Sequence, residues 1–480
     1  MGDVKEFYLT GENLTQSRLY ELQMLAKEFF PSAEIARSTS ELNLYFEGEF
    51  WKAEGKEESL AQPMPEKTAY EGMGGDPEKN RMKAGLYLLL RRWTGKDLPW
   101  GILTGVRPTK LAYSVMDAGM EPEKLEEHLK KYFFLREDKA RLMIRVAQQE
   151  RSLLSGHAGT DLDLYVGIPF CPTRCSYCSF VSYDFHTLGD TMERYTQALV
   201  QEIAAYGSFV QGRKLRSFYM GGGTPTSLEP GQLDRVLAAV QRTFGLENMS
   251  EATVEAGRPD TITREKLAVL RDYGICRISV NPQTMNEETL LRIGRRHTVE
   301  DTRRAFDLAR EMGFSNINMD FIMGLPGEGV QEAQYSMQEA CRMRPDNLTV
   351  HTLAVKRAAR LSQEEERREV LTSGSIEEMV ELGAQAARQL GMHPYYMYRQ
   401  KNMAGNFENV GYSTPGKECL YNIEIMEERQ SILAMGAGAV SKFYEPEKNR
   451  VERLPNVKNV EEYITRLDEM LERKKRRFGA

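Results

Sequence analysis

The chain has 480 residues, of which 41% are hydrophobic and 28% are charged. This composition is typical of a folded globular protein and excludes disorder over most of the length. The formal net charge is −6, from 64 basic and 70 acidic residues. An anionic partner would therefore need a local cationic site, and bulk binding of nucleic acid is disfavoured.

The start of the chain and the cysteines indicate the compartment. No apolar run approaches the roughly 18 to 20 residues that span a membrane, and residues 1–6 lack the basic and apolar regions of a signal peptide. We therefore expect a cytoplasmic protein without a membrane span. Six cysteines are too few for a disulfide scaffold, and three of them lie within residues 171–178. This clustering favours a metal site over crosslinks.

The first region, residues 1–160, has the pattern of an accessory α/β domain. A polar stretch with Gly and Pro at 54–79 predicts a loop inside it. Apolar residues at strand and helix spacing predict strands at 6–10, 41–48 and 49–53 and helices at 13–30, 81–94, 107–116, 121–132 and 136–154.

The second region, residues 161–356, alternates short apolar strands with helices. The predicted strands are 164–170, 216–221, 252–256, 277–281, 316–323 and 348–354, and the helices between them are 191–206, 231–243, 264–273, 287–293, 299–312 and 331–342. Such alternation implies right-handed crossovers and a parallel sheet. We expect a partial (β/α)6 barrel with its functional residues at the carboxyl ends of the strands.

The third region, residues 357–480, predicts a helical C-terminal domain that covers the substrate. It contains a helix at 375–390, an aromatic irregular stretch at 394–407, a Gly-rich segment at 436–439 and a closing amphipathic helix at 460–473. The basic run at 473–477 could bind RNA or lipid, but it is interpreted as a solvated helix end.

The sharpest motif is a CxxxCxxC loop directly after the first barrel strand, formed by Cys171, Cys175 and Cys178. Three thiolates on one loop can hold three irons of a cubane cluster and leave the fourth iron open. Zinc is the alternative, but a structural zinc site needs four ligands. The nearest further candidate is His186, and Phe180 occupies a position where a fourth cysteine could stand. The other cysteines, Cys276, Cys341 and Cys419, are isolated and are predicted to be small buried residues.

A second motif, GGGTPT at 221–226, ends the second barrel strand. Its glycines let the backbone approach a small molecule, although a glycine triplet alone also fits a tight turn. Glu255, Gln283 and Asp320 lie in or just past later strands, where each could also be a loop anchor. Together with the cysteine loop they predict a groove for a zwitterion with a ribose.

These motifs, with the MGLPG turn at 323–327, resemble radical S-adenosylmethionine enzymes. More narrowly, YVGIPFC at 165–171 resembles the oxygen-independent coproporphyrinogen III oxidase group. The likeness is close over 164–354 and looser at 436–439. In the first region, LPWG at 98–101 and TGVRP at 104–108 are similar to the HemZ branch of that group.

The resemblance implies a fold, cofactors and site residues. The fold would be α/β, a radical S-adenosylmethionine partial barrel between the two other domains. Cys171, Cys175 and Cys178 would hold a four-iron four-sulfur cluster, whose open iron binds the amino and carboxylate groups of S-adenosylmethionine. Cofactor-contacting positions would be Tyr165, Tyr177, Gly222, Gly223, Thr224 and Glu255, while Gln283, Arg295, Asp320 and Ala354 would line a second cofactor molecule or the substrate space.

The resemblance also implies an activity. A deoxyadenosyl radical would take a hydrogen from a propionate of coproporphyrinogen III, and loss of carbon dioxide would leave a vinyl group, a step of heme biosynthesis. The expected partners are this tetrapyrrole and a reductant such as flavodoxin or ferredoxin. The alternatives are a heme-binding chaperone on the same fold and an enzyme that modifies heme. Arg295 would meet a propionate, or would be a surface residue beside Arg292 and Arg296.

Two positions depart from the oxidase pattern. Gly167 replaces the histidine of the Tyr-x-His-Ile-Pro stretch, and Phe180 replaces a cysteine two residues past the third ligand, as in the heme-chaperone relatives. Both departures weaken the oxidase assignment. His297 and His351 could replace the missing imidazole, although a single barrel histidine is more often structural.

Overall fold

The computed structural model describes residues 4–12, 14–56, 58–156, 159–180, 182–184, 190–354, 375–400 and 403–478. The chain divides into two compact units. The first contains Met1–Ser152, Gln363–Glu377 and Met397–Asn409, and the second contains Leu153–Ser362, Glu378–Tyr396 and Val410–Ala480. The finer division into three domains with limits at 160 and 356 stays a prediction.

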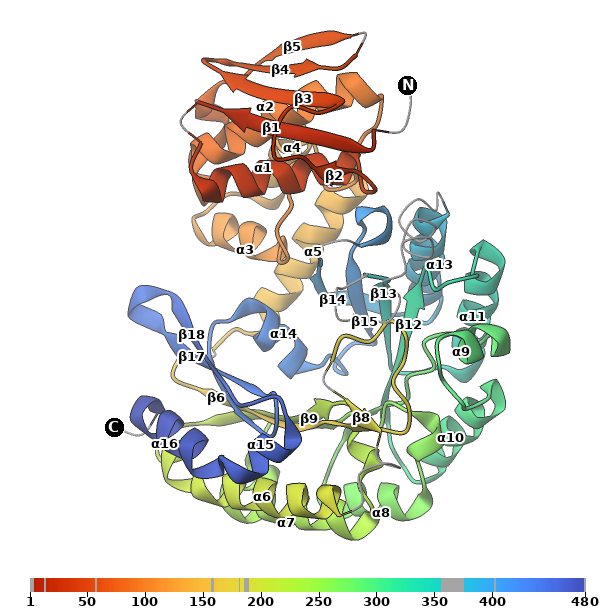
Figure 1. Ribbon diagram of the computed structural model, residues 1–480. Coiled ribbons are helices and arrows are strands. Elements are labelled where there is room, and N and C mark those ends of the chain that lie inside the picture. Colours follow the sequence, from red (N-terminus) through yellow and green to blue (C-terminus); the bar gives the residue numbers. More distant parts are fainter. Residues whose placement is uncertain are drawn as a thin grey trace. The chain divides into compact units, whose positions relative to one another are not determined.

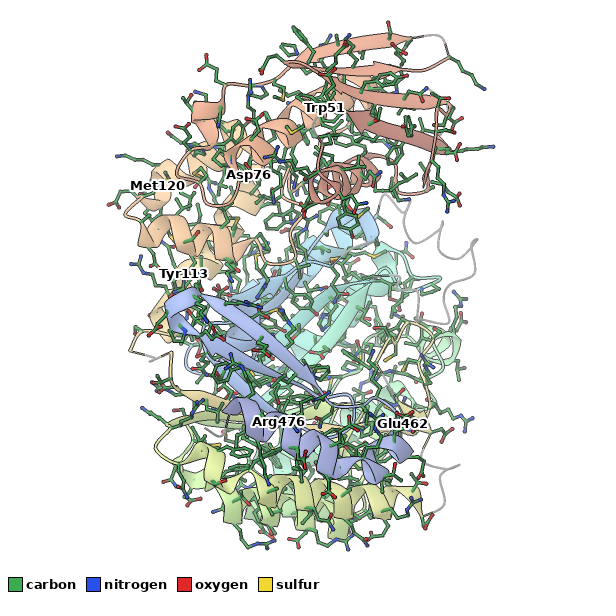
Figure 2. The ribbon with its side chains drawn as sticks, turned by 60° about the vertical axis from the view of Figure 1, so that its left-hand side comes forward. Trp51, Asp76, Tyr113, Met120, Glu462 and Arg476 are labelled. Carbon is green, nitrogen blue, oxygen red and sulfur yellow. The ribbon has the colours of Figure 1, made fainter. Side chains whose placement is uncertain are left out.

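The first unit is built on a five-stranded sheet in the order β2-β1-β3-β4-β5, against which α1 and α2 pack (Figure 1). Its elements are β1 (Glu6–Gly11), α1 (Gln16–Phe29), β2 (Glu34–Ile35), β3 (Leu42–Glu47), β4 (Phe50–Glu54), β5 (Ser59–Pro63), α2 (Pro77–Thr94), α3 (Thr109–Asp117), α4 (Pro122–Tyr132) and α5 (Glu137–Leu153). Alternate residues of the strands are buried, and Trp51 of β4 donates a hydrogen bond to the Met82 carbonyl at 2.9 Å (Figure 2). Burial of one sheet face and one stripe of each helix produces this core.

One strand of this unit lies where the sequence predicts a loop. β5 falls inside residues 54–79 and pairs antiparallel with β4. Its residues are exposed or half-buried because β5 is an edge strand, so it lacks the apolar alternation that identifies a strand.

The second unit contains the predicted run of six parallel strands. In sheet order they are β6 (Leu162–Ile168), β9 (Leu215–Gly222), β10 (Glu251–Val254), β11 (Arg277–Ser279), β12 (Asn316–Met323) and β13 (Asn347–Thr352). Neighbours pair parallel throughout. Helices α6 (Thr191–Ala205), α7 (Pro230–Phe244), α8 (Arg264–Asp272), α9 (Glu287–Arg292), α10 (Val299–Glu311) and α11 (Val330–Met343) lie along the outer side of the curved sheet (Figure 1).

The C-terminal part extends this sheet at both edges, which differs from the helical content that its sequence predicts. It contains β14 (His393–Tyr398), β15 (Asn409–Ser413), β16 (Ser431–Met435), β17 (Val440–Glu445) and β18 (Arg450–Pro455), besides α13 (Ile376–Gln389), α14 (Leu420–Glu427), α15 (Val460–Thr465) and α16 (Leu467–Phe478). β14 lies in the aromatic stretch predicted to be irregular. Its four central residues are all buried, so it shows no alternation.

The basic run at the end of α16 is only partly solvated. Arg476 is 81% exposed, as predicted (Figure 2). Lys474 is fully buried instead, and its Nζ lies 3.0 Å from Oε1 of the equally buried Glu202. In the described part of the chain, no helix is both long and apolar enough to cross a membrane.

Candidate functional site

The cysteine loop follows β6 and is held by backbone hydrogen bonds to two neighbouring turns. The Thr224 amide donates to the Phe170 carbonyl at 2.8 Å, which ties the start of the loop to the glycine turn after β9. The Ser176 amide donates to the Ile293 carbonyl at 3.0 Å, which ties its centre to the turn after α9. The loop therefore lies at the carboxyl ends of the strands, as predicted.

The three sulfurs of this loop suit a cluster better than a single ion. All three cysteines are free thiols, and Cys171 Sγ lies 3.5 Å from Thr224 Oγ1. Among the described residues, no three His, Cys, Asp or Glu side chains converge as a single metal ion requires. A cubane takes one sulfur for each of three irons and needs no such convergence. The residues therefore fit the cluster, and His186, the zinc alternative's fourth ligand, lies outside the described residues.

Of the isolated cysteines, only Cys419 is buried as predicted. Cys276 is exposed and Cys341 is half-buried. Cys276 lies in the turn before β11, at the opposite end of the strand from the site. A position outside the strand core explains its exposure.

Arg295 is buried beside the cysteine loop. Its Nη1 donates to the Asn281 carbonyl at 2.6 Å and its Nη2 donates to the Tyr177 hydroxyl at 3.2 Å. Burial opposes ionisation of Cys175, but Arg295 and Arg258 outweigh burial and lower the pKa of that thiol. Arg295 is 5% exposed, so the surface alternative is wrong for it.

The glycine turn approaches the protein's own backbone. A Cβ at Gly223 would lie 2.6 Å from the Phe170 carbonyl oxygen, and one at Gly222 would lie 3.1 Å from the Ile168 carbonyl oxygen. Gly222 also has a φ of +111°, which a side chain rarely tolerates. The prediction that these glycines make room for a small molecule is incomplete, because they first make room for the cysteine loop.

Glu255 follows β10 and belongs to a cluster of tyrosines. The Tyr219 hydroxyl donates to Glu255 Oε1 at 2.5 Å. Burial raises the pKa of the Glu255 carboxyl to about 7. The Tyr219 ring stacks on Tyr421 at 4.5 Å and on Tyr165 at 6.3 Å between centroids. Tyr421 comes from α14, and no local pattern in the sequence points to it.

Gln283 and Asp320 meet between β11 and β12. The Gln283 amide donates to the Asp320 carbonyl at 3.0 Å, and Gln283 has a φ of +71°. A left-handed residue other than glycine is strained, and such strain gathers at functional sites. His351 Nε2 lies 3.8 Å from Asp320 Oδ2, and Asp320 Oδ1 accepts from Asn318 at 2.7 Å. Ala354 lies just past β13, the next strand.

His297, the other candidate imidazole, is buried near Asp260, with its Nδ1 3.9 Å from Oδ1. Neither ring nitrogen has a hydrogen-bond partner among the described residues. Burial lowers the pKa of this imidazole to about 3. The ring is therefore neutral at physiological pH.

The Gly-rich segment at 436–439 contacts the first barrel strand. A Cβ at Gly436 would lie 2.4 Å from the Gly167 carbonyl oxygen. The Tyr195 hydroxyl donates to that same oxygen at 2.6 Å and accepts from the Ala437 amide at 3.1 Å. Gly167 thus contributes backbone rather than an imidazole at this position.

Comparisons with known proteins agree with this geometry. A family model described as the Radical SAM superfamily matches residues 165–340. The chain is 40% identical over 416 residues to the oxygen-independent coproporphyrinogen-III oxidase-like protein HemZ of Bacillus subtilis. The aligned region covers 86% of this chain and 82% of that protein.

Two further likenesses are more partial. The heme chaperone HemW of Bacillus subtilis is 35% identical over 193 residues, which is 40% of this chain and 50% of that protein. The solved structure of coproporphyrinogen III oxidase (HemN) from Escherichia coli matches with a TM-score of 0.52 at 22% identity, over 68% of this chain and 73% of that one. At this identity the structural likeness concerns the fold.

Proposed function

The chain belongs to the radical S-adenosylmethionine superfamily, in the group of HemZ, HemW and HemN, and from this premise we propose that it is an oxygen-independent coproporphyrinogen III oxidase. Membership confirms the resemblance and the predicted fold class. The superfamily uses a four-iron four-sulfur cluster and S-adenosylmethionine. The tetrapyrrole and its decarboxylation are the proposal.

Cys171, Cys175 and Cys178 would hold the cluster in this proposal. When bound there, the cluster and S-adenosylmethionine would supply one-electron radical chemistry toward the substrate. The protein holds the loop in place through Thr224, and Arg295 fixes the Tyr177 hydroxyl beside it. These contacts keep the three sulfurs on one rigid segment.

The remaining residues of the site would bind the cofactor and the substrate and would orient them. Glu255 accepts hydrogen bonds from the Tyr219 hydroxyl and from the Gly222 backbone amide, so its carboxyl is fixed at the glycine turn. Gly222 and Gly223 bring the backbone of the second strand against the loop. Gln283, Asp320 and Ala354 follow along successive strands, where a second cofactor molecule or the substrate would lie.

The proposal rests mainly on the contact between the cysteine loop and the glycine turn. The start of the cysteine loop and the glycine turn are joined by the 2.8 Å bond from the Thr224 amide to the Phe170 carbonyl. The 3.5 Å approach of Cys171 Sγ to the Thr224 hydroxyl joins the same two segments through their side chains. The two motifs that the resemblance assigns to one reaction centre therefore form a single structural unit.

A heme-binding chaperone is the second candidate function. Phe180 supports it, since it stands where the oxidase pattern has a cysteine, as in the chaperone relatives, and it is 64% exposed. An enzyme that modifies heme is a third possibility on the same residues. We further propose a cytoplasmic location and a reductant such as flavodoxin or ferredoxin.

An anaerobic assay separates these functions. The protein with its reconstituted cluster is incubated with S-adenosylmethionine, reductant, a one-electron acceptor and either coproporphyrinogen III or heme. The oxidase proposal expects loss of carbon dioxide from coproporphyrinogen III, detected by mass, and one deoxyadenosine for each decarboxylation. Unchanged coproporphyrinogen together with stoichiometric heme binding and transfer to an apo-acceptor would replace it with the chaperone.

A further inference from the structure

Arg258 is a buried cation to which none of the motifs assigns a role. It lies after β10, just before a 3-10 turn at Pro259–Thr261. Only 3% of the residue is exposed. An arginine is rarely buried so deeply unless it is paired, so its partners indicate what it does.

The two sides of the Arg258 guanidinium have different partners. On one side Nε and Nη2 donate to Oδ1 and Oδ2 of Asp260 at 3.0 and 2.8 Å, a bidentate pair that fixes the plane of the group. On the other side Nη1 donates to the Thr173 hydroxyl at 3.0 Å. The same Nη1 lies 3.9 Å from the Cys175 sulfur. Arg258 thus connects Asp260 to the centre of the cysteine loop.

The charged groups around Cys175 leave its sulfur in a cationic environment. Arg295 is the second buried cation beside this cysteine. Asp260 supplies the compensating negative charge and remains 23% exposed at its side chain, so water screens it more than it screens Arg258. His297 adds no charge, because its imidazole is neutral.

We propose that Arg258 is a positioning residue that raises the reduction potential of the cluster, and that Asp260 moderates this effect. The reduced cluster carries one more negative charge than the oxidised cluster. A buried guanidinium that donates to a ligand sulfur stabilises the reduced form more, and hydrogen bonds and charge near the sulfurs are what set such potentials. This inference depends on the cluster alone and not on which tetrapyrrole the protein binds.

The two partners give opposite predictions. Arg258→Gln keeps a hydrogen-bond donor but removes the charge, so the midpoint potential should fall. Asp260→Asn leaves the guanidinium in place without its counter-charge, so the midpoint potential should rise. We expect each substitution to change the ratio of reduced to oxidised cluster about tenfold at a fixed potential. For a one-electron couple this corresponds to a shift of about 59 mV in the midpoint potential.

The test is a redox titration of the reconstituted protein without S-adenosylmethionine, followed by electron paramagnetic resonance, with iron and sulfide measured in each sample. Arg264→Gln is the matched control, since Arg264 lies six residues on and its side chain is 53% exposed in a surface pair with Glu311. Its midpoint potential should equal that of the wild type.

Shifts of opposite sign at normal iron content support the proposal, because a residue that only shapes the loop would not reverse the shift. Equal potentials in the wild type and a loaded Arg258→Gln protein would overturn it. Where Arg258→Gln fails to fold or to hold iron, Asp260→Asn decides alone, and an unchanged or lower potential in that variant also overturns the proposal. Failure to decarboxylate coproporphyrinogen III leaves these outcomes unaffected.

Discussion

Two buried polar clusters of the second unit differ in how fully their hydrogen bonds are satisfied. Around Glu202, Oε1 accepts from Lys474 and Asn456, and Oε2 accepts from the Tyr463 hydroxyl and the Gly436 amide, at distances of 2.6 to 3.0 Å. The buried charge is fully paired. In this cluster, Oδ1 of Asn456 has no hydrogen-bond partner among the described residues.

The surroundings of the cysteine loop leave more buried polar atoms unpaired. Both nitrogens of His297, the Ser176 hydroxyl and Nε of Arg295 have no hydrogen-bond partner among the described residues. Buried polar groups are almost always paired in native proteins. The Glu202 carboxylate is thus neutralised within the fold, whereas several polar groups beside the cysteine loop are buried without a partner from the described residues.

The largest effect should come from the ligand cysteines. Replacing Cys171, Cys175 or Cys178 by alanine should abolish cluster formation, because in the proposed site each thiolate would hold one iron. Anaerobic reconstitution should give close to four irons per wild-type chain and none in the variants, while the exposed Cys276→Ala control keeps the wild-type content. Stoichiometric zinc without iron uptake would contradict the assignment.

Gly223→Val should also remove the cluster. A Cβ would lie 2.6 Å from the Phe170 carbonyl, so the side chain must displace the start of the cysteine loop. We expect loss of iron together with loss of S-adenosylmethionine binding, measured by metal analysis and equilibrium dialysis. Gly231→Val is the control, since a Cβ at Gly231 meets nothing within 4 Å. A Gly223→Val protein that keeps its iron but loses S-adenosylmethionine binding would mean that the glycines make room only for the small molecule.

Lys474→Met should destabilise the fold without affecting the reaction centre directly. Breaking a buried pair by removing one partner costs about 3 to 5 kcal/mol, because the remaining charge stays buried. The midpoint of urea unfolding should fall accordingly, while the exposed Arg476→Met control stays near the wild type. Adding Glu202→Gln to Lys474→Met should recover much of the loss. An unchanged midpoint in Lys474→Met would mean that this cluster is not structural.

The smallest effect concerns Glu255, whose pKa burial raises to about 7 from an ordinary 4.5. Between these values the folded protein binds more protons than the unfolded chain, so its stability falls as pH rises and levels off above 7. One proton gives a slope of at most about 1.4 kcal/mol per pH unit. Urea unfolding from pH 4.5 to 8 should show a steeper decline for the wild type than for Glu255→Gln. Parallel curves would mean that the carboxyl titrates normally.

The sequence predicts the barrel strands well because their signals are local. Each of the six strands lies within about two residues of its predicted limits, since buried parallel strands are short apolar runs between helices. The strands that it misses include β5 and β14, one because it is a polar edge and the other because it is buried on both faces.

The residues of the candidate site are likewise predictable from sequence only where they belong to short local motifs. The cysteines and glycines form short motifs and are found directly. Arg258, Tyr195 and Tyr421 carry no such signal, because each acts through a partner that is distant in the sequence. Tyr421, for example, stacks on a residue about two hundred positions earlier. Only tertiary structure brings such residues together.

The pairing of β16 with β6 has a consequence for synthesis of the chain. β6 lies between β9 and β16, and its Leu164 pairs with Leu433. A ribosome releases the cysteine loop long before it reaches residue 431, so one edge of β6 stays open during translation of all six barrel units. Domains fold as their residues emerge, and an unpaired strand edge can join to another chain. A nascent chain arrested before residue 431 should therefore be aggregation-prone, and β6 gains its second neighbour only after that residue has emerged.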